Sequence, residues 1–381
     1  MTAKVDPFRS LAIGRLAYRM QAEGRSVIHM EYGQPSVGAP KAAIAAAHRV
    51  LDTDAMGYWE SPALKARIAR HYDEAYGVTV APEQVILTCG ASPALLLALT
   101  RSFAPGDRVA LARPGYVAYR NTLKALHMVP VEIACGPAER FGLTAAALAA
   151  LEPAPRGVIV ASPANPTGAV LDAAELAAIV RVCQARGIRI ISDETYHGLT
   201  YGEPAHSLLE FEPRAFVINT FSKYYSMVGW RLGWVVAPPD QAEQAHAYMA
   251  HMFLTAPSLS QHAGLVTMDC VAELQAHLEM YRANRALMLQ AMPELGLTGI
   301  APPDGAFYIY ADIGHLTADS MAFCETLLRE TGVAAAPGLD FDPVEGPRFM
   351  RFSFAVTTPE VREAISRLIP WFQARGRAAG S

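Results

Sequence analysis

The chain has 381 residues, of which 52% are hydrophobic and 18% charged, and its formal net charge at pH 7 is −4. This length is sufficient for two domains with sizeable cores, and the apolar content excludes an intrinsically disordered polymer. The slight negative charge, with no long run of Lys or Arg, excludes the electrostatic surface that nucleic-acid binding needs.

The first 25 residues are interrupted by Asp6, Arg9 and Arg15, and no later stretch reaches the 18 or so uncharged apolar residues typical of a membrane span. The five cysteines are scattered, odd in number and free of CxxC spacing, which argues against a disulfide framework or a zinc site. We therefore expect a cytoplasmic chain that neither spans nor contacts a membrane.

The first clear unit is an apolar strand at residues 85–88 followed by a turn and a helix. Ser92 is a typical N-cap residue and Pro93 a typical first helical residue. The free amides of Gly90, Ala91 and Ser92, with the positive end of the helix, form a candidate anion site that favours a phosphate by roughly 0.3 to 2 kcal/mol. Taken alone, the motif favours an ordinary strand-to-helix turn.

A second unit begins with a buried strand at residues 158–161. After a turn, Asp172 and Glu175 stand at capping-box spacing before a helix that Gly187 can close. A further strand follows at residues 188–192. Two strands joined by such a helix are expected to be parallel, with a right-handed crossover, so that their carboxyl ends meet at the edge where α/β sheets bind ligands.

A third strand, at residues 216–218, places Lys223 at the same edge, among aromatic side chains. Desolvation there would lower the pKa of this lysine and raise its neutral, nucleophilic fraction, which imine formation with an aldehyde requires. The hydroxyls of Thr220 and Ser222, with Arg231, suit a phosphate held close to the lysine. These parts together indicate pyridoxal phosphate.

After about residue 250 the pattern becomes more helical, with a helix at residues 281–292 and then strands at residues 306–311 and 349–354. This change indicates a second domain. Before it, residues 85–221 alternate short β-branched runs with helical patterns, which is typical of a mostly parallel sheet wrapped by helices. The sequence therefore predicts an α/β fold.

The order and spacing of seven motifs resemble the class I and II aminotransferases of fold type I, the aspartate aminotransferase superfamily. The motifs are residues 33–35 (GQP), 90–92 (GAS), 114–116 (PGY), 165–168 (NPTG), 193–196 (DETY), 222–223 (SK) with 229–231 (GWR), and 351–354 (RFSF). The resemblance covers nearly the whole chain. It implies a mostly parallel sheet sandwiched by helices in a large cofactor-binding domain at residues 47–280, and a smaller α+β domain formed by residues 1–46 and 281–381.

The resemblance implies pyridoxal 5′-phosphate as cofactor and Lys223 as its Schiff-base lysine, which as a free amine moves a proton between the substrate Cα and the cofactor C4′. Asp193 is the implied partner of the pyridine nitrogen, which it keeps protonated so that the ring acts as an electron sink. Asn165 and Tyr196 are the implied donors to the phenolic oxygen of the cofactor. Tyr116 resembles the aromatic residue that stacks on the pyridine ring.

Further roles carried by the resemblance concern the cofactor phosphate and the substrate. Arg351 resembles the arginine whose bidentate fork grips the substrate α-carboxylate, beside Gly33 and Asn165. Tyr58 corresponds to the residue that reaches the phosphate of the neighbouring subunit, although the segment 58–65 is shorter than the family pattern and lacks its glycine. The implied phosphate contacts within the chain are Gly90, Ala91, Ser92, Thr220, Ser222 and Arg231.

The function implied is transfer of an amino group from a 2-amino acid to a 2-oxo acid in two half-reactions, by a metal-free homodimer with shared active sites. A β-eliminating lyase of the cysteine-S-conjugate type is the alternative on the same scaffold. A non-catalytic ligand-sensing domain is disfavoured, because only about 25 residues precede the strand predicted at residues 27–31. The aromatic residues Tyr58, Trp59, Tyr116 and Tyr225 favour an apolar or aromatic amine donor.

Overall fold

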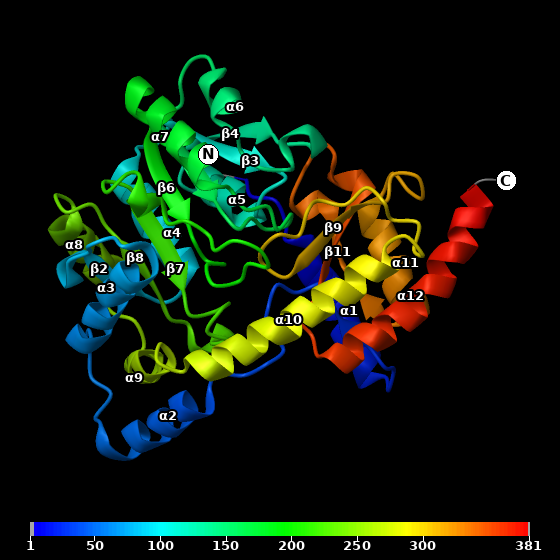
Figure 1. The fold of residues 1–381 in the computed structure, drawn as a ribbon, viewed down its shortest axis with the longest axis horizontal. Helices are drawn as coiled ribbons and strands as arrows, with labels where there is room; N and C mark the ends of the chain where they lie inside the picture. The colour runs from blue at the N-terminus through cyan, green and yellow to red at the C-terminus, as the bar shows by residue number, and fades with distance from the viewer. Residues whose placement is uncertain (1–3, 380–381) are drawn as a thin grey trace.

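The computed structural model describes residues 4–379, and its centre is a seven-stranded sheet (Figure 1). The strands of this sheet are β2 (Val85–Thr88), β3 (Arg108–Arg113), β4 (Val129–Ala134), β5 (Gly157–Ala161), β6 (Arg189–Asp193), β7 (Phe216–Thr220) and β8 (Gly233–Val236), in the order β2-β8-β7-β6-β5-β3-β4. Only β8 runs against its two neighbours, and all other pairs are parallel. The carboxyl ends of the other strands therefore share one edge, and the predicted fold class is confirmed.

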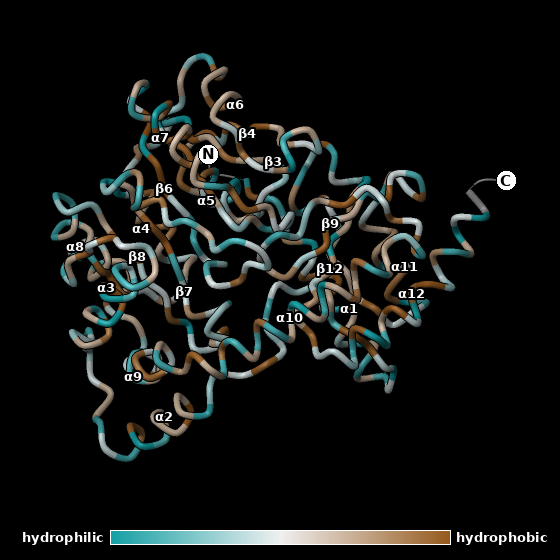
Figure 2. The backbone as a smooth tube through the Cα atoms, viewed as in Figure 1, coloured by the Kyte–Doolittle hydropathy of each residue, from teal (hydrophilic) through white to brown (hydrophobic). Residues whose placement is uncertain are grey.

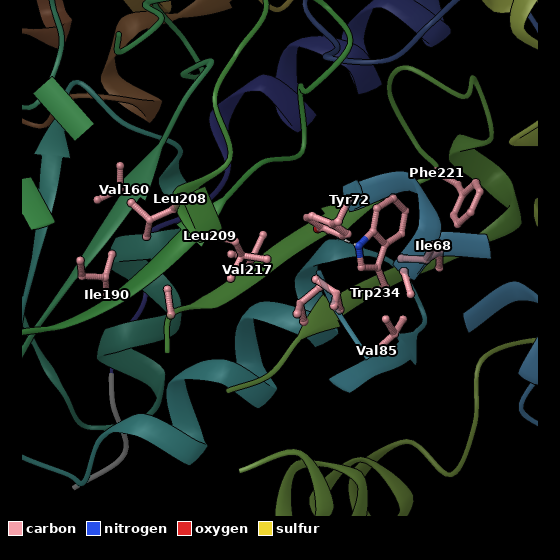
Figure 3. Packing of buried hydrophobic residues seen from close by; sticks show 14 of the residues in the cluster. Ile68, Tyr72, Val85, Val160, Ile190, Leu208, Leu209, Val217, Phe221 and Trp234 are labelled. Atoms are coloured by element: carbon pink, nitrogen blue, oxygen red, sulfur yellow. Dashed lines mark hydrogen bonds between the residues drawn. The ribbon is translucent and has the colours of Figure 1, made fainter. Parts of the chain in front are cut away.

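Helices cover both faces of the sheet, so its strands are apolar on both sides. Val217 and Trp234 pack on one face, whereas their chain neighbours Ile218 and Val235 pack on the other. In the first of these cores the indole nitrogen of Trp234 donates to the hydroxyl of Tyr72 at 3.1 Å (Figure 3). The helices around the sheet are α3 (Pro62–Tyr76), α4 (Ala91–Ser102), α5 (Val117–Ala125), α6 (Ala145–Ala149), α7 (Ala173–Arg186), α8 (Ala242–Met252) and α9 (Ser258–Thr267).

A second core joins the beginning of the chain to its end. It is built on an antiparallel sheet of β9 (Tyr308–Asp312), β11 (Ala336–Pro337) and β12 (Phe349–Ser353), and on a parallel pair of β1 (Ile28–His29) and β10 (Val333–Ala334). Its helices are α1 (Arg9–Ala22), α11 (Ser320–Thr331) and α12 (Thr358–Ala379). Figure 2 shows brown apolar stretches along the inner strands of both sheets and teal polar stretches in the surrounding loops.

The long helix α10 (Val271–Ala291) runs from the region of the large sheet to the second core, and α2 (Lys41–Thr53) lies against α9 (Figure 1). The predicted division at residues 46/47 and 280/281 stays a prediction, and its outermost residues 1–3 and 380–381 lie outside the described part. Position 280 falls inside α10. Among residues 4–379, no helix is both long and apolar enough to cross a membrane.

The local predictions for helix ends are partly confirmed. The side chain of Asp172 accepts a hydrogen bond from the Glu175 amide at 2.8 Å, and Gly187 closes α7 in the left-handed region. The prediction for α4 is wrong, because Gly90, not Ser92, is the N-cap residue. Gly90 has φ +97, which an L side chain rarely adopts, so the helix begins early and Ser92 lies within its first turn.

Candidate active site

A cleft of about 280 Å³ opens at the carboxyl edge of the large sheet, between the two cores. Gly90 packs against Arg231, which lines this cleft. The segment carrying Tyr58 lies outside the cleft. The cleft brings together most of the predicted site residues, which are Gly33, Ala91, Ser92, Tyr116, Asn165, Asp193, Tyr196, Thr220, Ser222, Lys223, Arg231 and Arg351.

Lys223 stands in the turn after β7 and reaches across the cleft to the opposite core. Its Nζ donates to the backbone carbonyl oxygen of Gly33 at 2.5 Å. Burial, together with the positive charges of Arg351 and Arg231, lowers the pKa of Lys223 to about 8, although the carboxylate of Asp193 opposes this shift. A substantial fraction of this amine is therefore neutral near physiological pH.

Asp193 ends β6 and is held from two sides. Its Oδ2 accepts a hydrogen bond from the Tyr119 hydroxyl at 2.7 Å, and its Oδ1 accepts one from the Thr195 amide at 3.0 Å. Both partners line the cleft with it. These bonds fix the carboxylate in one orientation, in a buried place where a protonated ring nitrogen could pair with it.

The corner formed by the first turn of α4 and by the turns after β7 has the chemistry of a phosphate site. A Cβ atom at Gly90 would lie 2.4 Å from Nη2 of Arg231, so only glycine lets the guanidinium come this close. The Oγ1 of Thr220 and the Oγ of Ser222 are 3.0 Å apart, and both line the cleft. Hydroxyls, helix amides and a guanidinium are the donors that a phosphate dianion takes.

Arg351 is buried and enters the cleft from β12. Its Nη1 donates to Oδ1 of Asn165 at 2.8 Å, and its Nη2 donates to the carbonyl oxygen of Glu31 at 2.6 Å. Its Nε has no hydrogen-bond partner among residues 4–379. Because the amide oxygen of Asn165 accepts from Arg351, its NH₂ group keeps its two donors for another partner.

Two tyrosines that follow or begin strands of different sheets meet in the wall of the cleft. The hydroxyl oxygens of Tyr196 and Tyr308 are 2.6 Å apart, and the guanidinium carbon of Arg351 lies 4.2 Å from the centre of the Tyr308 ring. Burial raises the pKa of Tyr196 and of Tyr116, so both phenols stay protonated and can donate.

Tyr58 does not join this cluster. It lies between α2 and α3 with 84% of its surface exposed. Its neighbour Trp59 stacks on His262 with ring centroids 4.7 Å apart. Within its own chain, Tyr58 is therefore not a cleft residue.

The cleft also contains residues that the sequence did not single out. Tyr116 is the N-cap residue of α5, and Tyr119 follows it by three positions in the first turn of that helix, a spacing that could have found it. Tyr308 lies within a predicted strand, but nothing local links it to Tyr196, 112 residues away. The other unpredicted lining residues are Phe8, Ser10, Glu31, Tyr32, Gln34, Leu95, Ala118, Thr122, Thr195 and Val228.

Comparison with known proteins gives a consistent result. The family model described as aminotransferase class I and II matches residues 25–368. A valine–pyruvate aminotransferase from Mycobacterium tuberculosis is 44% identical over 98% of each chain. A crystal structure of an aminotransferase from the same organism is 44% identical, with a TM-score of 0.95 over 97% of each chain. A crystal structure from Silicibacter pomeroyi is 47% identical, with a TM-score of 0.92 over 97% of this chain and 98% of that one.

Proposed function

Given that this chain belongs to the class I and II aminotransferases, we propose that its cleft takes the amino group from a 2-amino acid with an uncharged side chain and passes it to a 2-oxo acid. The transfer itself is the activity of the family. The side-chain class of the donor, the roles of the residues and the dimer are the parts proposed here. The arrangement of Lys223, Asp193 and Arg351 around one cleft is the observation that carries them.

The family implies pyridoxal 5′-phosphate, and the residues present fit this group. The corner of Gly90, Ser222 and Arg231 offers donors for its phosphate, and Asp193 offers a buried carboxylate for its ring nitrogen. Asn165 is placed to donate to its phenolic oxygen. When bound, pyridoxal 5′-phosphate supplies an electron sink for the negative charge that develops at the substrate Cα.

Lys223 is the proposed proton carrier of the reaction. Its lowered pKa leaves part of the amine neutral, so it can accept the proton of the substrate Cα as a general base. The carbonyl of Gly33, which it contacts, lies in the wall formed by the second core. This contact fixes the position of the amine within the cleft.

Arg351 is the proposed anchor of the substrate α-carboxylate. Its planar fork matches a carboxylate in a way that lysine cannot, and its burial strengthens the interaction. Asn165, whose Oδ1 accepts a hydrogen bond from Arg351, and Lys223 line the same cleft as this anchor. Binding at Arg351 therefore orients the substrate Cα toward Lys223.

The rest of the cleft wall supports an uncharged substrate side chain. Apart from Lys223, Arg231 and Arg351, no lysine or arginine lines the cleft in residues 4–379, so a second substrate carboxylate finds no further cation there. The remaining wall includes Phe8, Leu95, Ala118, Tyr116 and Val228. The name of the valine–pyruvate relative agrees with this choice of substrate.

A homodimer with shared active sites is part of the proposal. Apolar side chains are exposed on α2 and on the neighbouring segments, where a second copy could cover them. These side chains are Ile44, Leu51, Tyr58, Met252 and Leu254. In such a dimer the exposed Tyr58 would reach the phosphate corner of the partner. All five cysteines are free, which supports a location in the reducing cytoplasm.

The test is the visible spectrum of the cofactor-loaded protein during addition of single amino acids without any oxo acid. We expect valine, leucine or methionine to bleach the yellow band at far lower concentration than aspartate. A preference for aspartate would contradict the side-chain class. A persistent band with accumulating pyruvate would indicate β-elimination, and no band at all would exclude Lys223 as the linking residue.

A further inference from the structure

Tyr308 touches two parts of the proposed site that are otherwise separate. It lines the cleft from β9, is fully buried, and contacts Tyr196 through its hydroxyl and Arg351 through its ring. We propose that Tyr308 is a positioning residue that couples the carboxylate anchor Arg351 to Tyr196, the donor to the cofactor's phenolic oxygen. This inference rests on the proposed function.

The ring of Tyr308 forms one side of a slot for Arg351. The guanidinium carbon lies 4.2 Å from the centre of the Tyr308 ring and 4.7 Å from the centre of the Phe341 ring. A planar cation between two aromatic faces is attracted by both and cannot tilt freely. Its two terminal nitrogens are also fixed, by Asn165 and by the carbonyl of Glu31. The ring therefore helps to set the plane in which a carboxylate must dock.

The hydroxyl of Tyr308 acts on the other partner. Each phenol has one proton, so when Tyr196 donates to the cofactor, the 2.6 Å contact between the hydroxyls requires Tyr308 to donate to Tyr196. A donor that itself accepts a hydrogen bond becomes a stronger donor, by about 10–30% per bond. Tyr308 thus strengthens the bond from Tyr196 without touching the cofactor.

The backbone makes room for this hydroxyl at one position. A Cβ atom at Gly33 would lie 2.1 Å from Oη of Tyr308, so the hydroxyl occupies the space that any other residue would fill. The carbonyl of the same glycine accepts the hydrogen bond from Lys223. The tyrosine pair and the lysine are therefore held by one short backbone segment.

The hydroxyl and the ring make separate predictions. The phenolic oxygen of the cofactor would share a proton with the linked lysine nitrogen. A hydrogen-bond donor to that oxygen competes with this proton, so it lowers the pH at which the visible absorption is half changed, called here the midpoint. We expect Tyr196→Phe to raise this midpoint by about one to two pH units and Tyr308→Phe by a few tenths of a unit.

Tyr308→Phe keeps the ring and should change KM for the amino acid less than about twofold. Tyr308→Leu also loses the ring and should raise KM about 2- to 10-fold.

The decisive measurement is a double-mutant cycle on the absorption midpoint of the loaded protein. In the Tyr196→Phe background, Tyr308→Phe should produce no further shift, because the hydroxyl acts only through Tyr196. Tyr310→Phe is the matched control. Tyr310 lies two positions along the same strand, is buried, and its hydroxyl has no hydrogen-bond partner in the described part of the chain, so its removal should leave both midpoint and KM unchanged.

The possible results distinguish a failure of the Tyr308 coupling from a failure of the proposed function. An equal shift with and without Tyr196, or no shift in Tyr308→Phe, overturns the coupling while the proposed function stands. A KM for Tyr308→Leu equal to that of the wild type overturns the role of the ring. A wild-type protein that develops no visible band with pyridoxal 5′-phosphate overturns the proposed function itself.

Discussion

Lys223 donates to the backbone carbonyl oxygen of Gly33, 190 residues earlier in the chain, at 2.5 Å. This one hydrogen bond crosses the cleft from the edge of the large sheet to the segment after β1. The nitrogen with the lowered pKa is therefore positioned by both cores, and a displacement of either core moves it relative to Asp193 and Arg351. The predictions below test this arrangement.

The lowered pKa of Lys223 predicts how fast the apoprotein takes up its cofactor. Only the neutral amine attacks an aldehyde, so the rate at which the visible band forms should rise about tenfold per pH unit and level off near pH 8. An exposed lysine analogue such as Nα-acetyl-lysine should level off more than two units higher. A protein midpoint close to that of the analogue would contradict the effect of burial.

Arg351→Lys tests the planar fork. Lysine keeps the charge but loses the bidentate geometry and the bond to Asn165, so kcat/KM should fall about 10- to 100-fold, chiefly through KM. Arg348→Lys is the control, because Arg348 is half-exposed and pairs with Asp312 outside the cleft. It should change kcat/KM less than about twofold. Equal losses in both variants would mean that Arg351 does not bind the substrate.

Gly33→Ala tests the close approach of Tyr308. The added Cβ would lie 2.1 Å from the hydroxyl oxygen, and strain of about 1 to 3 kcal/mol at the site should lower kcat/KM by about 5- to 150-fold. Adding Tyr308→Phe, which removes the hydroxyl, should restore part of the loss. Gly38→Ala is the matched control, since nothing lies within 4 Å of its added Cβ. A Gly33→Ala protein with unchanged kcat/KM would refute the packing argument.

The raised pKa of Glu194 predicts that the stability of the folded protein depends on pH. Burial raises its pKa to about 8, against hydrogen bonds from Leu208, Ser207 and Ser192 to its carboxylate. The folded state therefore holds a proton that the unfolded chain releases above about pH 4.5, so this contribution to stability falls as pH rises and is lost above pH 8. Glu194→Gln carries no such proton.

The comparison is made by urea unfolding of the cofactor-loaded proteins at pH 6 and at pH 8. Between these values the wild type should lose unfolding free energy, on the order of 1 to 3 kcal/mol, relative to Glu194→Gln. The exposed Glu203→Gln serves as control and should follow the wild type. Parallel curves for wild type and Glu194→Gln would show that Glu194 is ionised in the folded protein.

Tyr58 can be tested by mixing two damaged proteins. If Tyr58 acts on the partner's cleft, Tyr58→Ala and Lys223→Ala subunits placed in one dimer leave one cleft with both native residues. Unfolding and refolding the mixture should then restore activity above the sum of the separate proteins. Refolded mixtures that show only that sum would place Tyr58 outside the site.

The fold could be predicted from the sequence because its signals are local. The apolar runs of β2, β5, β6 and β7 and the cap at Asp172 each depend on a few neighbouring residues. The predicted start of α4 was wrong because Gly90 has a positive φ, and this overrides the N-cap preference of Ser92. Local sequence patterns predict the usual backbone conformation, but they miss a residue such as Gly90 that departs from it.

The candidate site was only partly predictable for a related reason. The residues that carry chemistry, such as Lys223 and Asp193, stand in motifs, and the cleft contains them. Their supports come from distant segments. Tyr119 meets Asp193 across 74 residues, and Tyr308 meets Tyr196 across 112, and no spacing rule connects such pairs. Tyr58 is exposed in the single chain, so its role depends on a second copy.

The pairing of β1 with β10 determines which parts of the chain can fold first during synthesis. Ile28 aligns with Val333, so the strand that emerges first must wait for a partner synthesised roughly 300 residues later, which takes on the order of 15 to 60 s at roughly 5 to 20 residues per second. During this interval the apolar face of α1, including Ile13 and Leu16, has no final partner. The large sheet is complete at Val236, well before translation ends. Nascent chains should therefore protect the large sheet first, and the opening segment should be the last to become resistant to proteases.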